Sequence, residues 1–395
     1  MHYFGKISLI LTVSLAFIAF FWRSVRPSTA QTIQCQNNDP IVQTFSGGAK
    51  WELCWAHDDL KGIILTNLHY TTANGTRRKV LNSAEIGQIF TAFDDNSARL
   101  HQVSDVGLGG ERLRALSSAE CSGTLHQHNG QPILCSQQLE RGYLYKFHHL
   151  QAQATKLQLH TVSFIGEQAY IVQWSLFDDG TIEPAIGYSG QLDRIGTDAR
   201  YGWPLDGGNG IGVGQITTAY WRLDFDLGNN GPNDVVEQIE AQPTDLNYRK
   251  ELAITPILTE TGRTINPQLK RSWRVRDGVI TNADGHAISY QLEPMQAAHH
   301  HVAPASEPWT AHDLYVTVDT ACEQFVSHNP TDSGCGDNVT DFVNGQTLVS
   351  ADLILWYGIT YRHLPRDEDE AYRNVHWDSF QLVPRDWTAV SEVAQ

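Results

Sequence analysis

Short runs of apolar, β-branched and aromatic residues, rather than long periodic stretches, make up the hydrophobic pattern of this chain. Residues 157–164 mix alternating apolar and polar positions with β-branched residues, and residues 170–177 have the same character. An Asp-Asp-Gly turn at 178–180 then leads into Thr181 and Ile182. Period-two alternation beside an Asp-Gly turn is typical of a β-hairpin. The pattern therefore predicts antiparallel strands on either side of this turn.

Similar strand-like runs recur along the chain, at residues 62–70, 219–227, 287–292, 314–318 and 353–361. Residues 83–93 are the one stretch that predicts a helix. Many short strands separated by Gly, Asn and Pro turns are typical of a sandwich or a barrel. No internal repeat, low-complexity linker or block of charge divides the sequence. We therefore expect a single all-β domain over residues 31–395.

The first thirty residues have a different character. Lys6 precedes an apolar run at 7–22, and small residues follow at 28–30. The run is short for a membrane span and suits the apolar core of a signal peptide. Arg23 and Arg26 are instead typical of an uncleaved signal anchor, so both interpretations stay open. In either case the rest of the chain is translocated, and we expect a secreted or lumenal protein whose only membrane attachment would be this segment.

Cysteine usage agrees with translocation. An even number of cysteines in a translocated chain indicates disulfides, although six cysteines allow fifteen connectivities. Pairing in sequence order closes short loops, which favours it on the loop-entropy model. The predicted disulfides are Cys35–Cys54, Cys121–Cys135 and Cys322–Cys335. Asn74 and Asn338 begin Asn-X-Thr sequons, which predict a glycoprotein if the host is a eukaryote.

The formal charge of −16 bears on the class of partner. Removing the first thirty residues, which hold three basic residues and no acid, would leave about −19, from 25 basic and 44 acidic residues. An acidic surface of this kind repels phosphate backbones, so we expect no nucleic-acid binding. A cationic small molecule would be attracted, although an acidic surface also serves solubility alone.

Several segments together resemble the topaquinone-dependent copper amine oxidases. They are Leu-Ile-Leu-Trp-Tyr at 353–357, His-Leu-Pro-Arg-Asp-Glu-Asp at 363–369, Asn-Pro at 266–267 with Arg-Ser-Trp-Arg-Val at 271–275, His-Asp-Leu-Tyr-Val-Thr at 312–317, Asp-Val-Gly-Leu-Gly at 105–109 and Gly-Thr-Ile-Glu-Pro at 180–184. They follow the family's order between about residues 51 and 380. The resemblance implies the large antiparallel β-sandwich of the family's catalytic domain, and it implies a homodimer.

The family's quinone is made in place from a tyrosine, and the resemblance puts Gln168 at that position. An amide cannot become a quinone, because the chemistry needs a phenol ring that copper and oxygen can hydroxylate. Tyr170 matches the motif's second tyrosine, on the same strand face but two residues away. The resemblance therefore implies that topaquinone is absent.

Copper in the family is held by a His-X-His pair and a distant third histidine. Counting back from Arg-Leu-Asp at 222–224, the pair falls on Gln215 and Thr217. Amide and hydroxyl oxygens are weak ligands for Cu(II) beside imidazole. His363 matches the third ligand. One histidine makes a feeble site, so we expect no bound copper.

Two family features survive in the alignment. Asp105 matches the position of the family's catalytic base, which removes a proton from the substrate's carbon. An aspartate in this sequence is also ordinary for a turn, so both interpretations stay open. A peripheral calcium site is also matched, and carboxylate and carbonyl oxygens suit this hard cation. Its candidate ligands are Asp224, Phe225 (backbone), Asp226, Asp352 and Leu353 (backbone). A carboxylate-rich hairpin edge is the structural alternative.

These features leave three interpretations. The chain is a binding or structural protein that uses the sandwich as a scaffold, or a repurposed enzyme without redox chemistry. In the second case Asp105 would carry out acid–base chemistry on a small molecule in the old substrate pocket, such as a cyclisation or an isomerisation. The third interpretation is an active copper-dependent primary amine oxidase. A preserved fold should bring Asp105, Gln168 and His363 to one interior pocket.

Overall fold

The computed structural model describes residues 33–36, 38–97, 103–205, 210–245, 249–295, 306–330 and 334–390. The chain divides into two units, Met1–Thr32 and Ile33–Gln395, and every described residue belongs to the second. The predicted signal segment lies outside the described residues. Across the described residues, no helix combines the length and the apolar character needed to cross a membrane.

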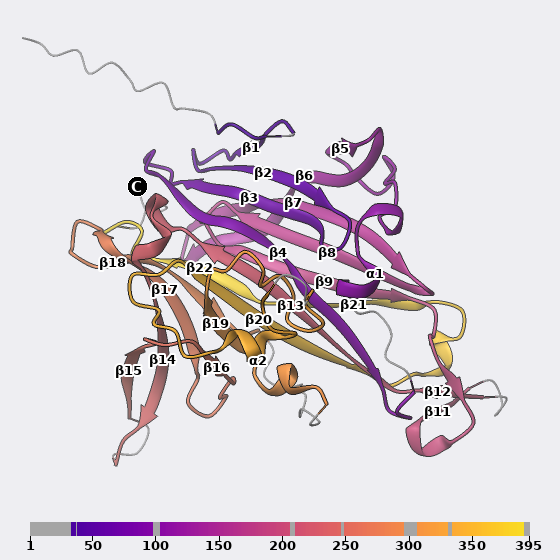
Figure 1. The fold of residues 1–395 in the computed structure, drawn as a ribbon. Coiled ribbons are helices and arrows are strands. Elements are labelled where there is room, and N and C mark those ends of the chain that lie inside the picture. Colours follow the sequence, from indigo (N-terminus) through magenta and orange to yellow (C-terminus); the bar gives the residue numbers. More distant parts are fainter. Residues whose placement is uncertain are drawn as a thin grey trace, which may run out of the picture. The chain divides into compact units, whose positions relative to one another are not determined.

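The first large sheet has eight antiparallel strands and forms one layer of a sandwich (Figure 1). In spatial order they are β1 (Ile41–Thr44), β2 (Lys50–Asp58), β3 (Gly62–Thr71), β4 (Arg77–Phe93), β13 (Gln215–Phe225), β20 (Leu353–His363), β19 (Leu314–Val318) and β16 (Thr261–Arg263). Strands from the two ends of the sequence therefore meet in the middle of the layer, where β13 pairs with both β4 and β20.

The second sheet has eleven strands and forms the other layer. In spatial order they are β15 (Lys250–Pro256), β14 (Asp234–Pro243), β17 (Ser272–Thr281), β18 (Ala287–Glu293), β22 (Gln381–Arg385), β9 (Ile182–Gly190), β8 (Gln168–Phe177), β7 (Leu150–Ile165), β6 (Gln131–Phe147) and β5 (Thr124–His128), with β21 (Arg373–Ser379) also paired to β9. A small third sheet holds β10 (Ile195–Gly196), β12 (Gly210–Val213) and β11 (Gly202–Leu205). The described helices are single turns, α1 (Val103–Val106) and α2 (Val339–Phe342), besides short 3-10 turns. The predicted all-β antiparallel sandwich is confirmed.

Large aromatic side chains fill the space between the two layers. Trp221 from the first sheet is fully buried, and its ring centroid lies 5.2 Å from that of Phe380, which precedes β22. Trp51 from β2 donates through Nε1 to the carbonyl of Phe177 at the end of β8, at 2.8 Å. Buried indole N–H groups need such partners. These contacts fix the layers against each other.

The predicted helix at 83–93 is wrong, because these residues form the second half of β4. Both faces of this stretch are buried. Ile86 and Ile89 pack into the main core, whereas Phe90 and Ala92 pack into a second cluster. A strand covered on both faces shows no alternation of polar and apolar residues, so its pattern can be mistaken for that of a helix.

The hairpin between β8 and β9 is confirmed. Gly180 donates its N–H to the carbonyl of Phe177 at 3.0 Å and has φ of +88°, which favours glycine. A Cβ atom at this position would come within 2.7 Å of the Tyr70 ring. The turn therefore needs glycine both for its backbone conformation and for its close approach to β3.

The structure contains the three sequential disulfides, Cys35–Cys54, Cys121–Cys135 and Cys322–Cys335. Their Cα–Cα distances of 5.5, 5.7 and 5.7 Å are ordinary for disulfides. The two sequons differ in accessibility. Asn74 is exposed in the turn between β3 and β4, whereas Asn338 is buried and caps α2 by accepting from Thr340 N at 2.9 Å.

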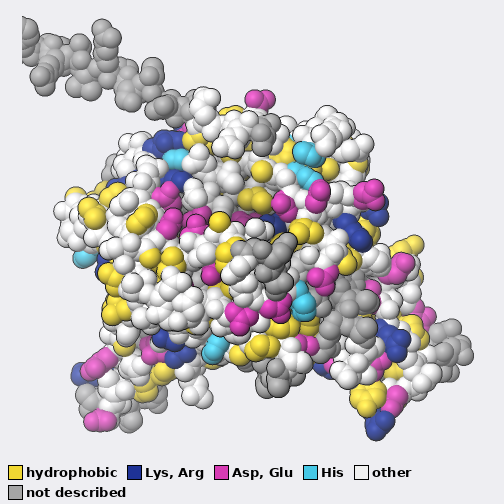
Figure 2. All heavy atoms as spheres, viewed as in Figure 1, with side chains coloured by type: hydrophobic (Ala, Val, Ile, Leu, Met, Phe, Trp, Pro, Cys, Tyr) yellow, Lys and Arg dark blue, Asp and Glu magenta, His cyan; other side chains and the backbone are white. Residues whose placement is uncertain are grey.

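The described surface is rich in acidic side chains. Figure 2 shows Asp and Glu side chains across the middle of one face, with Lys and Arg side chains scattered singly among them. This distribution agrees with the formal charge of −16.

Candidate functional site

The positions matched to copper ligands lie side by side at one end of the first sheet. Gln215 opens β13 and pairs directly with His363, the last residue of β20. Thr217, two residues along, pairs with Tyr361 and is 1% exposed. Because residues two apart point to the same face of a strand, the sequence positions predicted to belong together do come together.

Tyr170 extends this cluster into the second sheet. It lies on β8, and burial raises its pKa far above the ordinary value for a phenol. A side-chain hydrogen bond joins Tyr170 to Thr91 on β4. The Thr91 hydroxyl lies 3.0 Å from that of Thr217. A chain of hydroxyl groups therefore crosses the interior from one layer to the other.

Gln168 is buried at the start of β8, but its side chain is committed to the backbone. Its Nε2 donates to the carbonyl of Gln191 at 2.6 Å. On the sheet, Gln168 pairs with Gly190, which pairs in turn with Arg373 at the start of β21. The amide at the position matched to the quinone therefore holds the segment after β9 through this hydrogen bond.

His363 is held by a buried carboxylate. Its Nε2 lies 3.1 Å from Oδ2 of Asp369, which also accepts from Arg366 N at 3.1 Å. Burial lowers the pKa of His363, and the positive charge of Arg373 lowers it further. The ring is therefore neutral near pH 7. It carries its proton on Nε2, facing the carboxylate, and presents the lone pair of Nδ1.

Arg373 is a buried guanidinium in the same cluster. It is 5% exposed and donates through one terminal nitrogen to the carbonyl of Ser189 at 2.9 Å. Burial lowers its pKa, and the opposing charge of Asp193 acts against that shift. The cluster thus contains a fixed cation contributed by the protein itself.

A cavity of about 320 Å³ adjoins these residues. Its walls include Tyr188, Tyr361, His363, Asp369, Arg373 and His376. Three of the rings form a stack, with 3.7 Å between the centroids of Tyr361 and His376 and 5.5 Å between those of Tyr361 and Tyr188. The space is therefore polar, bounded by charged groups and by the edges of stacked rings.

Asp105 does not belong to this cavity, so the predicted pocket shared by Asp105, Gln168 and His363 is wrong. Asp105 is exposed on α1. Val103 anchors that turn in the core, with its N–H bonded to the side chain of Gln88 at 2.7 Å. An exposed carboxylate keeps its hydration, whereas an interior position would require paired donors. Gln168 does not line the cavity either.

Comparisons with known proteins agree with this architecture. Residues 48–394 match the family model described as "Copper amine oxidase, enzyme domain". The chain belongs to the copper amine oxidase family.

Relatives in the family are distant. The primary amine oxidase of Pisum sativum is 21% identical over 388 residues, covering 85% of this chain and 57% of that protein. The histamine oxidase of Arthrobacter globiformis is 23% identical over 376 residues, covering 85% and 54%. The chain therefore spans little more than half the length of these relatives.

Solved structures show the same fold. A copper-containing benzylamine oxidase from Hansenula polymorpha has a TM-score of 0.77 at 14% identity, covering 96% of this chain and 66% of that one. The lysyl oxidase of Pichia pastoris has a TM-score of 0.76 at 16% identity, covering 87% and 52%. At this identity the likeness speaks for the fold alone.

The amine oxidase cofactors do not fit the residues of the cluster. Gln168 has no phenol, and its amide is already bonded. Gln215 and Thr217 offer weak oxygen donors beside the single imidazole of His363. The cluster instead contains a guanidinium, which repels a metal cation.

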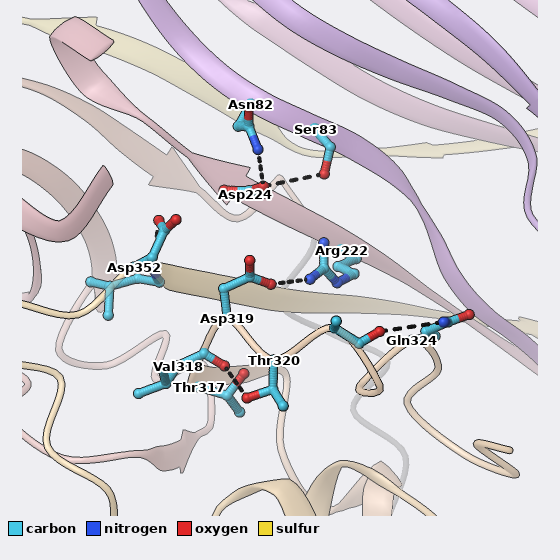
Figure 3. A network of polar contacts seen from close by, with 12 residues as sticks. Asn82, Ser83, Arg222, Asp224, Thr317, Val318, Asp319, Thr320, Gln324 and Asp352 are labelled. Atoms are coloured by element: carbon cyan, nitrogen blue, oxygen red, sulfur yellow. Dashed lines mark hydrogen bonds and ion pairs between the residues drawn. The ribbon is translucent and has the colours of Figure 1, made fainter. Parts of the chain in front are cut away.

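The candidate calcium ligands lie elsewhere, and Figure 3 shows two of them, Asp224 near the end of β13 and Asp352 before β20. Asp224 accepts from Asn82 at 2.8 Å, and burial raises its pKa to about 7. Burial and the charge of Asp319 also raise the pKa of Asp352. In the described structure one oxygen of Asp224 and one of Asp226 are buried without a hydrogen-bond partner, which fits a cation. Lys79 already neutralises the other oxygen of Asp226, at 2.5 Å.

Several residues of the cluster escaped the sequence analysis. Asp369 stands within the recognised segment at 363–369, so its proximity to His363 could have been proposed from that spacing. Arg373 and Tyr188 carry no such signal. They reach the cavity because β21 adds to β9, a pairing between segments far apart in sequence.

Proposed function

We propose that this chain is a secreted member of the copper amine oxidase family that carries out no copper or quinone oxidation and binds a small ligand in the cavity beside His363. The observation that carries the proposal is the makeup of the cluster. Gln168 stands at the position matched to the quinone, Gln215 and Thr217 stand at positions matched to copper ligands, and His363, which pairs with Gln215, is hydrogen-bonded to Asp369. Three intrachain disulfides support a secreted protein.

A binding protein is favoured over a repurposed acid–base enzyme. The enzyme reading rested on Asp105 as an interior base, and this carboxylate is exposed. General acid–base catalysis needs a titrating group within hydrogen-bond reach of the substrate. The one carboxylate that lines the cavity, Asp369, is already engaged by His363 and Arg366. Such pairing suits a rigid binding surface.

The competing function is an active copper-dependent primary amine oxidase, the activity named for relatives such as the Pisum sativum protein. Metal analysis separates the two functions. The purified chain is incubated with Cu(II), dialysed, and assayed for copper per chain, for quinone by redox-cycling stain, and for oxygen uptake with a primary amine. The histamine oxidase of Arthrobacter globiformis, treated in parallel, is the positive control.

The expected result is no stoichiometric copper, no quinone stain and no amine-dependent oxygen uptake by this chain. The physical reason is the absence of a phenol at residue 168 and of imidazoles at residues 215 and 217. One tightly bound copper per chain together with a positive quinone stain would establish the oxidase function and refute the proposal.

A further inference from the structure

Two histidines form a contact between the two large sheets. His57 lies near the end of β2 in the first sheet, and His128 ends β5, an edge strand of the second sheet. Their rings are stacked, with 4.3 Å between centroids and 23° between planes. Two residues earlier on each strand, the rings of Trp55 and His126 meet edge to face, with 6.0 Å between centroids. These four residues are called the histidine seam.

A backbone strap, residues 107–114, lies against the turn between β2 and β3. The N–H of Leu108 donates to the carbonyl of Leu60 at 2.8 Å, and that of Gly109 donates to the carbonyl of Asp59 at 3.0 Å. A Cβ atom on Gly109 would lie 2.9 Å from Cα of Asp59, so the approach is close. The last residue of the strap donates to a carbonyl of β7 in the second sheet at 2.9 Å. The strap therefore joins the two layers beside the seam.

The next bond of the strap ends on an imidazole instead of a carbonyl. The N–H of Gly110 donates to Nε2 of His57 at 2.9 Å. An acceptor nitrogen carries no proton, so the neutral ring has its proton on Nδ1, which lies 3.9 Å from Oδ1 of Asp59. A protonated imidazole has two donors and no acceptor. Protonation of His57 therefore breaks the bond to Gly110, whereas the carbonyl bonds beside it do not titrate.

The surroundings of His57 set the balance between its neutral and charged forms. The side chain is 9% exposed, and burial makes the largest contribution to lowering its pKa. His128 lowers the pKa of His57 further, because two stacked imidazolium rings repel each other. Asp59 and Asp58 act in the opposite direction and only partly offset these two effects. The neutral ring is therefore favoured in the closed structure near pH 7.

The other groups around the seam do not reverse this balance. The strap carries one charge of each sign after its bond to the seam, on Glu111 and Arg112. Burial also lowers the pKa of His126, whose Nε2 lies 2.7 Å from the hydroxyl of Ser136. A hydroxyl can donate or accept, so this contact tolerates either form of the ring. Both buried histidines are thus neutral at pH 7, and proton uptake favours states in which they are exposed.

We propose that the histidine seam is an acid-sensitive latch, which holds the strap against the first sheet at neutral pH and releases it in acid. Proton uptake by His57 removes the acceptor for Gly110 and places a positive charge beside His128. The carbonyl bonds of the strap are too few to keep it closed once this bond is lost. The latch does not depend on the ligand cavity or on the fate of the copper chemistry.

Proton linkage gives the size of the effect. In the released state the His57 ring is solvated and has the ordinary histidine pKa of 6.5. Below that pH, one proton that binds only on opening makes the opening equilibrium about tenfold larger for each further pH unit. The rise ends when the pH falls below the lowered pKa of the closed state. Between pH 7.5 and pH 5.5 we therefore expect a rise of about five- to tenfold.

The test is amide hydrogen exchange of the full chain, read by mass spectrometry with fragmentation that resolves the Gly110 amide. Exchange is measured at pH 7.5, 6.5 and 5.5, and each rate is divided by the intrinsic rate at that pH to give the opening equilibrium. The expected rise should appear at Gly110 and be absent from amides inside β8, which report on opening of the whole domain. An opening equilibrium at Gly110 that is the same at all three pH values would overturn the inference.

Variants separate the latch from a general loss of stability in acid. His57→Gln keeps an acceptor near the position of Nε2 and cannot titrate, so Gly110 should stay protected at every pH. His57→Phe lacks the acceptor and should leave Gly110 exchanging fast at every pH. His128→Phe keeps the stack without the charge and should reduce the rise. His149→Gln, at an exposed histidine, is the matched control and should behave as the wild type.

Two results would refute the latch. A rise in His57→Gln equal to that of the wild type would show that acid acts elsewhere in the chain. A full rise in His128→Phe would show that the stacked pair has no part in the response, and this variant serves if the changes at His57 prevent folding.

Discussion

Replacing Asp234 by asparagine should stabilise the protein near neutral pH and not in acid. Asp234 opens β14, is 1% exposed, and pairs on the sheet with Asp277, which is fully buried. One oxygen of Asp234 accepts from Leu227 N at 3.0 Å. Its other oxygen, and Oδ2 of Asp277, are buried without partners in the described structure. Two carboxylates thus lie opposite each other with unsatisfied oxygens.

The magnitude follows from the pKa of Asp234. Burial raises it to about 8 from the ordinary 3.8, the Leu227 amide partly opposes the shift, and the charge of Asp277 adds to it. The stability that depends on the protonated group is complete below about pH 4 and is lost as pH rises through 8. At pH 7, about three pH units above the ordinary pKa of 3.8, the protonated Asp234 lowers the unfolding free energy by at most about 4 kcal/mol, at about 1.4 kcal/mol per pH unit. Partial relaxation leaves an expected gain of about 1–3 kcal/mol.

The assay is urea unfolding of the wild type and Asp234→Asn at pH 7.5 and pH 4.5, with chelator present. Asparagine keeps the shape and the acceptor for Leu227, and its amide offers a donor to Asp277. The gain in unfolding free energy at pH 7.5 should shrink to about 0.5 kcal/mol or less at pH 4.5. Asp284→Asn, at an exposed position, is the matched control and should change little. A loss of stability in Asp234→Asn at both pH values would show that an ionised Asp234 is needed, and would refute this reasoning.

Three further outcomes are expected. Calcium should raise the melting temperature and a chelator should reverse this rise, because a divalent cation relieves the repulsion around Asp224. Asp224→Asn should abolish the response, and a wild-type melting temperature that does not change with calcium would rule the site out. Asp105→Asn should leave the melting temperature unchanged, since this carboxylate is exposed; a marked fall in melting temperature would show that its charge stabilises the fold. In a eukaryotic host, Asn74→Gln should remove an attached glycan while Asn338→Gln removes none, because Asn338 is buried in its cap; mass spectrometry of glycopeptides checks both.

Local pattern accounts for most of the sheet structure that could be predicted. The run at 314–318 coincides with β19, and the Asp-Gly turn leads from β8 into β9 as expected. The failure at 83–93 has a physical cause, since β4 is covered on both faces and loses its alternation. Which strands pair is decided by packing between distant segments, and a local pattern carries no such information.

The same distinction applies to the site. Gln215, Thr217 and His363 could be placed together because a resemblance in sequence preserves register between neighbouring strands. The orientation of Asp105 could not be predicted, because a single helical turn exposes it while Val103, two residues earlier, is buried. Tyr188 lies on β9, and β21 pairs with that strand and brings His376 opposite it. A pairing between segments so far apart in sequence could not be predicted.

The residues matched to the cofactor positions and the buried Arg373 affect a metal ion through the same electrostatics. A copper ion held by imidazoles needs neighbours that are neutral or negative. Two like unit charges about 4 Å apart repel by about 4 kcal/mol at an effective dielectric constant of 20, and a divalent ion doubles that cost. Arg373 depresses the pKa of His363, so its charge is felt at the remaining ligand position. Without the two histidines, a guanidinium can occupy this interior, balanced by Asp193 and Asp369. A metal ion at this position would therefore require removal of the arginine as well as imidazoles at residues 215 and 217.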